Sequence, residues 1–145
     1  MINTFSYPVT LKPEQQGGFT VLFPDLPEAI TCGDNRRDAL VQAADCLEEA
    51  IASRIADGRQ IPAPSRSRRG QQLVPVPAPM AAKAALYLAM KEAGVTNVEM
   101  ASRLGVDEKE VRRMLDPRHP TKLPRIQDAL ELLGRRLVVG VEKAA

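Results

Sequence analysis

Hydrophobic and polar residues alternate near the start of the chain and take helical spacing further on. Alternate positions from Thr4 to Leu11 are apolar, which predicts a strand, and Pro8 within it suits an edge strand or an outer face. After the turn marked by Gly17-Gly18, residues 19–23 predict a second strand, and residues 29–32 a short third one. The prolines between them end the second strand, because proline fixes φ and lacks an amide donor.

A helix is predicted to follow the third strand. Asp34 or Asn35 can cap its start, and Asp38 adds negative charge to the first turn, where the helix dipole favours it. Gly58 supplies the stop. The apolar positions recur on one helical face and are Leu40, Ala43, Ala44, Leu47, Ile51 and Ile55.

Three strands and one helix make a unit that is too small to be more than marginally stable alone. We therefore expect a further strand, and residues 73–76 (Leu-Val-Pro-Val) are the candidate, at a sheet edge because of the proline. Residues 59–70, which carry prolines, serines and several arginines, predict a flexible basic linker or loop. Two roles stay open for this segment: a solvated tether, or an arm that contacts phosphate.

The second half of the sequence predicts four helices in succession. The first covers residues 81–92 and ends at Gly94. A capping box opens the second, over about 97–104, and an Asp cap with an acid three residues later opens the third, which ends near 115. Pro124 starts the fourth, which runs to Gly134.

Two short helices on a three-residue turn are typical of a helix-turn-helix. Ala101 is small where the helices cross, Gly105 serves the turn, and Val111 packs beneath the second helix. The rest of the inner face consists of Met100, Leu104, Val106, Met114 and Leu115. The alternative is an ordinary helical hairpin.

Outward polar residues of this motif, together with the proline-bounded loop after it, are the candidates for contact with double-stranded DNA. For each of them the alternative is a solvated surface position. The candidates are Asn97, Glu108, Lys109, Arg112, Arg113, Arg118, His119 and Lys122.

Residues 136–141 predict an apolar strand that has no neighbour in this half. A lone strand has to pair somewhere, and a twofold partner chain is the economical answer. We therefore expect a homodimer or a higher even oligomer, with Leu137, Val138, Val139 and Val141 as the dimerisation residues.

Composition excludes several classes of protein. The 145 residues contain no apolar run near the roughly 20 residues of a membrane span, and no charged-then-apolar start typical of a signal peptide. Cys32 and Cys46 lack metal-ligand spacing, and a single histidine argues against a zinc site or a His-based triad. We expect a reduced cytoplasmic protein without metal or cofactor.

Charge is unevenly distributed along the chain. Residues 1–58 carry net −5, residues 59–80 net +4 and residues 81–145 net +3. An acidic unit suits a basic protein partner, and a basic helical unit suits phosphate.

The run from Phe19 to Asp34 (Phe-Thr-Val-Leu-Phe-Pro-Asp-Leu-Pro-Glu-Ala-Ile-Thr-Cys-Gly-Asp), with the Ala-rich helix after it, resembles the HicB family of antitoxins from bacterial toxin–antitoxin modules. The family pattern is a strand, then Pro-Asp-Leu-Pro-Gly, then a Thr-x-Gly-Asp turn into the helix, and Glu28 stands where the family often has glycine. The resemblance covers the whole chain, because one branch of the family appends a helix-turn-helix like residues 81–135.

The resemblance implies an α+β protein with two domains. Residues 1–77 would form a degenerate ribonuclease H-like β-β-β-α-β unit that binds and blocks a HicA-type, mRNA-cleaving toxin. Residues 78–145 would form an all-α helix-turn-helix domain that ends in the dimerising strand, binds operator DNA and represses the antitoxin's own operon.

For toxin contact we expect the strand-to-turn segment Phe23, Asp25, Leu26, Pro27 and Glu28, as exposed apolar residues beside acids. The alternative is that Leu26 packs under the helix. We expect no enzyme activity, because Asp25 and Asp34 are better explained as turn and cap residues than as a metal-binding cluster. The alternative function is a dimeric helix-turn-helix regulator whose N-terminal domain senses a small ligand.

Overall fold

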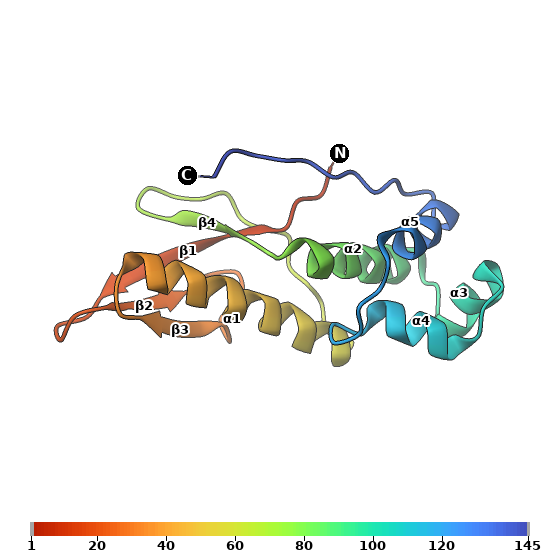
Figure 1. The fold of residues 1–145 in the computed structure, drawn as a ribbon, viewed down its shortest axis with the longest axis horizontal. Helices are drawn as coiled ribbons and strands as arrows, with labels where there is room; N and C mark the ends of the chain where they lie inside the picture. The colour runs from red at the N-terminus through yellow and green to blue at the C-terminus, as the bar shows by residue number, and fades with distance from the viewer. Residues whose placement is uncertain (1, 145) are drawn as a thin grey trace.

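The computed structural model describes residues 2–144 and confirms a mixed α+β protein. Figure 1 shows the strands with the long helix α1 at one end, the short helices at the other, and α2 between them. In chain order the elements are β1 (Ser6–Pro13), β2 (Phe19–Leu22), β3 (Ile30–Gly33), α1 (Arg36–Ala56), β4 (Gln72–Pro75), α2 (Ala78–Ala93), α3 (Asn97–Leu104), α4 (Glu108–Leu115) and α5 (Leu123–Leu132). Over the described residues, none of the helices is long and apolar enough to cross a membrane.

The four strands form one antiparallel sheet in the order β3-β2-β1-β4. Thr10 lies opposite Leu22 of β2, and Tyr7 opposite Val74 of β4. The sheet buries one face beneath α1, on which Tyr7, Val9 and Val21 are fully buried. The expected strand near residues 73–76 is confirmed, and its proline, Pro75, lies on an edge strand as predicted.

The expectation that Pro8 lies on an edge strand or an outer face is wrong, because β1 is a central strand and Pro8 is buried within it. β1 pairs with β4 through residues 6–9 and with β2 through residues 10–13. The half of β1 that contains Pro8 therefore pairs only with β4. Because β2 does not pair with this half, the amide that proline lacks costs no hydrogen bond to β2.

Helix α1 begins and ends where the sequence predicts. The Asn35 side chain accepts a hydrogen bond from the Asp38 amide at 2.8 Å, and the amide of Gly58 donates to the carbonyl of Ile55. At its start the helix lies unusually close to β3, since a Cβ on Gly33 would stand 2.3 Å from the Ala39 nitrogen. Only glycine permits this approach.

Helix α2 is shared between two hydrophobic cores. Met80, Ala84 and Tyr87 pack with the sheet and α1, whereas Ala82, Leu86, Ala89 and Met90 pack with the helices that follow. Apolar residues on every side of a helix are typical of a buried one. The two halves of the molecule are thus joined through the opposite faces of one helix.

The segment between α1 and β4 is attached to the body of the protein at several points. Ile61 is buried, the Tyr7 hydroxyl donates to the Pro62 carbonyl, and the Tyr87 hydroxyl donates to the Arg59 carbonyl, both at 2.7 Å. Burial raises the pKa of Tyr7 to about 12, so this hydroxyl remains a donor at neutral pH.

The second core confirms the predicted inner face of the short helices. Met100, Ala101, Val111 and Met114 are buried, and Leu104, Val106 and Leu115 are partly buried against them. α5 buries Ile126, Ala129 and Leu130, but leaves Leu132 46% exposed.

The single chain has no strand at residues 136–141, since residues 135–144 form no helix or strand, and the pairing of this segment with a partner chain stays a prediction. Figure 1 shows the segment running from α5 back across the molecule toward the end that holds β4. Leu137 packs on the second core, whereas Val138, Val139 and Val141 are exposed. A strand needs a hydrogen-bonded neighbour, and the sheet of this chain ends at β4.

Candidate binding surfaces on the two halves

Helices α3 and α4 are both capped by the side chains that the sequence indicates. Thr96 Oγ1 accepts from the Glu99 amide at 3.1 Å, and Asp107 Oδ1 accepts from the Glu110 amide at 2.9 Å. Gly105, at φ 69°, ends α3 in the left-handed conformation that the turn requires. The caps fix where each helix begins, and therefore which residues face outward.

Three cations of α4 face outward: Lys109, Arg112 and Arg113 are exposed. Arg112 pairs with Glu108 at 2.7 Å and Arg113 with Glu110 at 3.6 Å, both within the helix. Such exposed pairs contribute only about 0.3–0.5 kcal/mol each, so a phosphate or a base can displace them at little cost. The outer face of α4 is therefore a cationic surface whose charges are available.

Lys83 of α2 anchors the loop that follows α4, and sequence reasoning missed it. Its side chain is buried, and Nζ donates to the carbonyls of Arg113 and Asp116 and to Thr121 Oγ1, at 3.1, 2.7 and 2.9 Å. Burial lowers the pKa of Lys83, and the nearby Asp116 carboxylate opposes this effect. The signal was present in the sequence, as a lone lysine inside the apolar run of residues 80–90.

The loop after α4 carries the remaining predicted DNA contacts. Arg118 and Lys122 are exposed and His119 is half-buried. The Arg118 amide donates to Asp116 Oδ1 at 2.9 Å, which closes the turn, and Lys83 holds the same loop from the other side. The structure thus places all eight predicted residues in one half, on α3, α4 and this loop.

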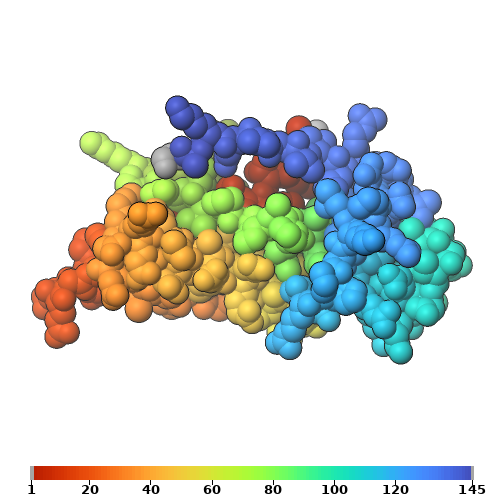
Figure 2. Space-filling model, in the orientation of Figure 1, coloured from red at the N-terminus to blue at the C-terminus, as the bar shows by residue number. Residues whose placement is uncertain are grey.

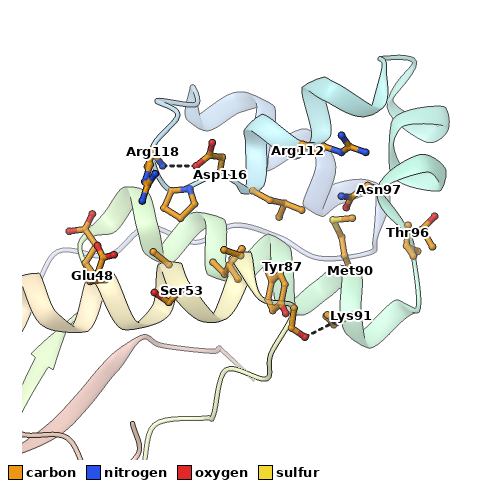
Figure 3. Close-up of a pocket in the computed structure, with 18 of the residues that line it drawn as sticks. Glu48, Ser53, Tyr87, Met90, Lys91, Thr96, Asn97, Arg112, Asp116 and Arg118 are labelled. Carbon is orange, nitrogen blue, oxygen red and sulfur yellow. Dashed lines mark hydrogen bonds between the residues drawn. The ribbon is translucent and has the colours of Figure 1, made fainter. Parts of the chain in front are cut away.

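The eight residues do not all share one environment, because three of them line a groove of about 1020 Å³ between α4 and α1. Asn97, Arg112 and Arg118 lie on one side (Figure 3). Figure 3 shows Arg118 projecting over α1 on the side of Glu48, whereas Arg112 points away from α1. The acidic wall on α1 consists of Asp45, Glu48 and Glu49. This wall repels phosphate, so the outer face of α4, away from α1, is the favourable side for a polyanion.

The strand-to-turn segment of the first half differs from expectation in two residues. Phe23 is 2% exposed and Leu26 is fully buried, so the expectation that they present apolar surface is wrong. Phe23 continues the inward alternation of Val21, and Leu26 packs under α1 in the same core. The buried alternative for Leu26 is the correct one.

Asp25, Pro27 and Glu28 remain at the surface of this turn. Asp25 accepts hydrogen bonds from the amide and the hydroxyl of Ser65, which ties the turn to the segment before β4. Pro27 is exposed. The turn is therefore rigid on one side and open on the other.

Glu28 forms a two-point ion pair with Arg54 of α1. Arg54 Nε and Nη2 donate to its carboxylate at 2.6 and 2.9 Å, and Nη1 donates to the carbonyl of Gln60. The hydrogen bond from Arg54 lowers the pKa of Glu28 to about 2, although burial opposes it. Glutamate fits here without strain, since every non-glycine residue from 2 to 144 has negative φ.

Neither cysteine belongs to a cluster of ligands. Cys32 is exposed, and partial burial raises the pKa of the half-buried Cys46 thiol. Within residues 2–144, histidine, cysteine and acidic side chains form no group of three or more that could hold a metal ion.

Comparison with known proteins bears on both halves. A family model described as "HicB_like antitoxin of bacterial toxin-antitoxin system" matches residues 6–85, which is β1 through the first half of α2. Curated relatives extend the likeness to the helices that follow. "Antitoxin HicB 1" of Photorhabdus laumondii is 39% identical over 142 residues, covering 98% of this chain and 90% of that protein.

Two further relatives agree. "Antitoxin HicB" of Escherichia coli K12 is 36% identical over 131 residues, covering 90% of this chain and 95% of that protein. "Antitoxin HicB" of Pseudomonas fluorescens is 34% identical over 132 residues, covering 90% of each. With its first half matched by the family model and 90–98% of its length matched by these relatives, the chain belongs to the HicB-like antitoxins of bacterial toxin–antitoxin systems.

Proposed function

We propose that the chain neutralises a HicA-type, mRNA-cleaving toxin through its first half and represses its own operon by binding operator DNA as a dimer through its second half. The observation that carries this proposal is the pair α3–α4: two capped helices on a three-residue turn, with three cations on the outer face of α4, joined to a unit of the antitoxin family. The family supplies the antitoxin role, and the exposed helix supplies a surface for DNA.

In this proposal α3 and α4 act as a helix-turn-helix. Ala101 and Val111 hold the two helices together, which leaves the face with Lys109, Arg112 and Arg113 for the major groove. Lys122 lies beside that face on the loop fixed by Lys83, where it contacts phosphate, whereas Arg118 projects over α1 (Figure 3) and has no part in this contact. Because the acidic wall on α1 repels phosphate, DNA approaches α4 from the side that faces away from α1.

Binding of the chain to a duplex that carries its own promoter tests the DNA half. If Arg112 reads a base, Arg112→Ala weakens operator binding by about 1–3 kcal/mol and relaxes preference at one position. Equal weakening on every sequence, with a shallower salt slope, marks a phosphate contact instead. Arg59→Ala is the matched control, since Arg59 is also exposed and ion-paired but lies outside α3–α4. Unchanged operator binding by Arg112→Ala and by a Lys109→Ala/Arg113→Ala double variant would refute the role of α4.

For toxin contact we propose the surface of the turn, namely the half-buried Asp25 and the exposed Pro27 and Glu28. The turn is acidic, lies in the half of the chain with net −5, and is held rigid by Ser65 and Arg54. A rigid acidic surface suits a basic RNA-binding protein, because complementary charge speeds encounter and selects the partner.

Co-purification with the product of the adjacent small reading frame tests the toxin half. Pro27→Arg places bulk and positive charge on the turn without removing a hydrogen bond, and we expect it to weaken the complex at least tenfold. Ala63→Arg is the matched control, at an exposed position outside the turn. Equal capture by both variants would show that the toxin binds elsewhere on the chain.

For dimerisation we propose that residues 136–141 pair with the same segment of a second copy. Val139 and Val141 are 72% and 100% exposed, which is unusual for valine unless a partner covers it. In sedimentation experiments we expect the wild-type chain to dimerise and Val139→Asp/Val141→Asp to be monomeric, with an unchanged circular dichroism spectrum that shows it is folded. A monomeric wild-type chain at micromolar concentration would contradict this proposal.

A further inference from the structure

The turn before β4 carries arginines that the antitoxin and operator roles do not use. Arg66, Arg68 and Arg69 are all exposed, and none of them takes part in the five ion pairs found among residues 2–144. In Figure 2 a side chain of this yellow-green segment projects from the surface beside the start of α1. The charges of these three arginines are therefore available to bind a partner.

This turn is fixed to the sheet, unlike a tether. The Arg68 amide donates to Gln71 Oε1 at 2.8 Å, and the Gln71 amide donates back to the Arg68 carbonyl at 2.9 Å. Gly70 takes φ +83° to close the turn, and Gln71 Nε2 donates to Thr10 Oγ1 of β1 at 3.3 Å. A turn ordered in advance loses less entropy when it binds.

The start of α1 adds two more exposed arginines to this end of the sheet. Arg36 Nη2 donates to Gln72 Oε1 at 3.0 Å, which places its guanidinium group against the first residue of β4, and Arg37 follows it. The nearest acids in sequence are Asp34 and Asp38, and Asp38 Oδ2 accepts a hydrogen bond from the Asp34 amide. Cations thus outnumber carboxylates at this end, although the first 58 residues carry net −5.

The arginine turn lies far from α4. It adjoins the first residue of α1, whereas the groove beside α4 is lined by the second half of α1. A helix of 21 residues spans on the order of 30 Å, and Figure 1 shows the two regions at opposite ends of the molecule. Contacts made by α4 therefore do not account for this turn.

We propose that Arg66, Arg68 and Arg69, supported by Arg36, form a second site, independent of α4, for the phosphodiester backbone of a nucleic acid. The planar guanidinium group binds phosphate oxygens with two parallel hydrogen bonds, and closely spaced arginines match successive phosphates. The backbone can belong to duplex DNA beside the operator or to single-stranded RNA, and the test separates these two sources.

The test compares two triple variants of the full chain, Arg66→Gln/Arg68→Gln/Arg69→Gln and the charge-preserving Arg66→Lys/Arg68→Lys/Arg69→Lys. The probes are a duplex of about 20 base pairs without operator sequence and a single-stranded RNA of about 20 nucleotides, each titrated over a range of salt. The plot of log K against log salt has a negative slope. Loss of three phosphate contacts makes this slope shallower, by about 2.7 on the duplex and by about 2 on the RNA. Relative to 1 M salt, where the electrostatic contribution vanishes, these slope changes correspond at 0.1 M salt to losses of up to about 500-fold on the duplex and about 100-fold on the RNA.

We expect the Gln variant to lose affinity and slope, and the Lys variant to keep most of both. Loss on the duplex alone assigns the site to DNA, and loss on the RNA alone assigns it to RNA. A Gln variant that matches wild type on both probes overturns the proposal, as does a Lys variant whose salt slope is as shallow as that of the Gln variant, because lysine keeps the charge that sets the slope. The ratio of operator to non-operator affinity is a separate readout of α4, so failure of this site and failure of operator recognition are distinguishable.

Discussion

Replacing Lys83 by methionine tests how the second half holds the loop that follows α4. The substitution keeps most of the apolar stem but removes the buried charge and its three hydrogen bonds of 2.7–3.1 Å to Arg113, Asp116 and Thr121. It leaves neither carbonyl unpaired, because the Asp116 amide still donates to Arg113 and the His119 amide to Asp116. The loss is therefore that of the bonds themselves, without a further penalty for orphaned acceptors.

The expected magnitude follows from two opposing effects. Hydrogen bonds from a charged donor contribute about 1.5–3 kcal/mol each, whereas removing a buried ammonium returns part of its desolvation cost. We expect a net loss of about 2–3 kcal/mol in the free energy of unfolding, which lowers the melting temperature by about 5–10 °C. Because the same bonds hold residues 116–122, we also expect weaker binding to the promoter duplex.

The assay is urea unfolding followed by circular dichroism, with promoter binding measured on the folded protein. Lys91→Met is the matched control: Lys91 is also on α2 and donates to a carbonyl, that of Gly58 at 3.2 Å, but it is exposed. We expect the control to cost less than about 1 kcal/mol. A Lys83→Met variant as stable as wild type and equal to it in promoter binding would refute the reasoning.

Three further substitutions test separate parts of the account. Gly33→Ala should lower the free energy of unfolding in urea by about 3 kcal/mol or more, because the new Cβ would stand 2.3–2.4 Å from the backbone of Ala39. A loss below about 1 kcal/mol would mean that α1 can move off the sheet. Ala101→Leu should cost about 1–3 kcal/mol by overpacking the α3–α4 crossing, and unchanged stability would show that the crossing is loose. The pKa of Glu28 is lowered from 4.5 to about 2 by Arg54, so the stability advantage of wild type over Glu28→Gln should be complete above pH 4.5 and disappear as the pH falls toward 2. The pair is partly exposed, so about 1 kcal/mol is expected, and an advantage that persists at pH 2 would contradict the assigned cause.

The helices were predictable from sequence because their limits are encoded locally. Asn35, Thr96 and Asp107 accept hydrogen bonds from amides three residues ahead, and glycines follow the ends of α1, α2 and α3. These signals act within one turn, so no knowledge of the rest of the fold is needed.

Strand order and burial at the turn depend on contacts distant in sequence. Pro8 suggested an edge, but the strand order makes β1 central, and pairing in two separate halves accommodates the proline. Phe23 could have been recognised as buried, because it continues the alternation of Phe19 and Val21. For Leu26 the sequence left exposure and burial under the helix as alternatives, because only the folded structure shows that it packs in the core with α1.

The role of Lys83 was hidden for a similar reason. Its three acceptors lie 30 to 38 residues further along the chain, at the end of α4 and in the loop after it. A lysine within an apolar helix is unusual enough to notice, but its partners are known only once α2 and α4 are packed together.

The central claim is that this chain neutralises a toxin, and growth of cells that express the adjacent small reading frame tests it most directly. We predict growth arrest by that product alone, full growth when this chain is co-expressed, and only partial growth with the Pro27→Arg variant at equal expression. Arrest that wild-type chain does not relieve, although the protein is folded and present in excess, would contradict the account.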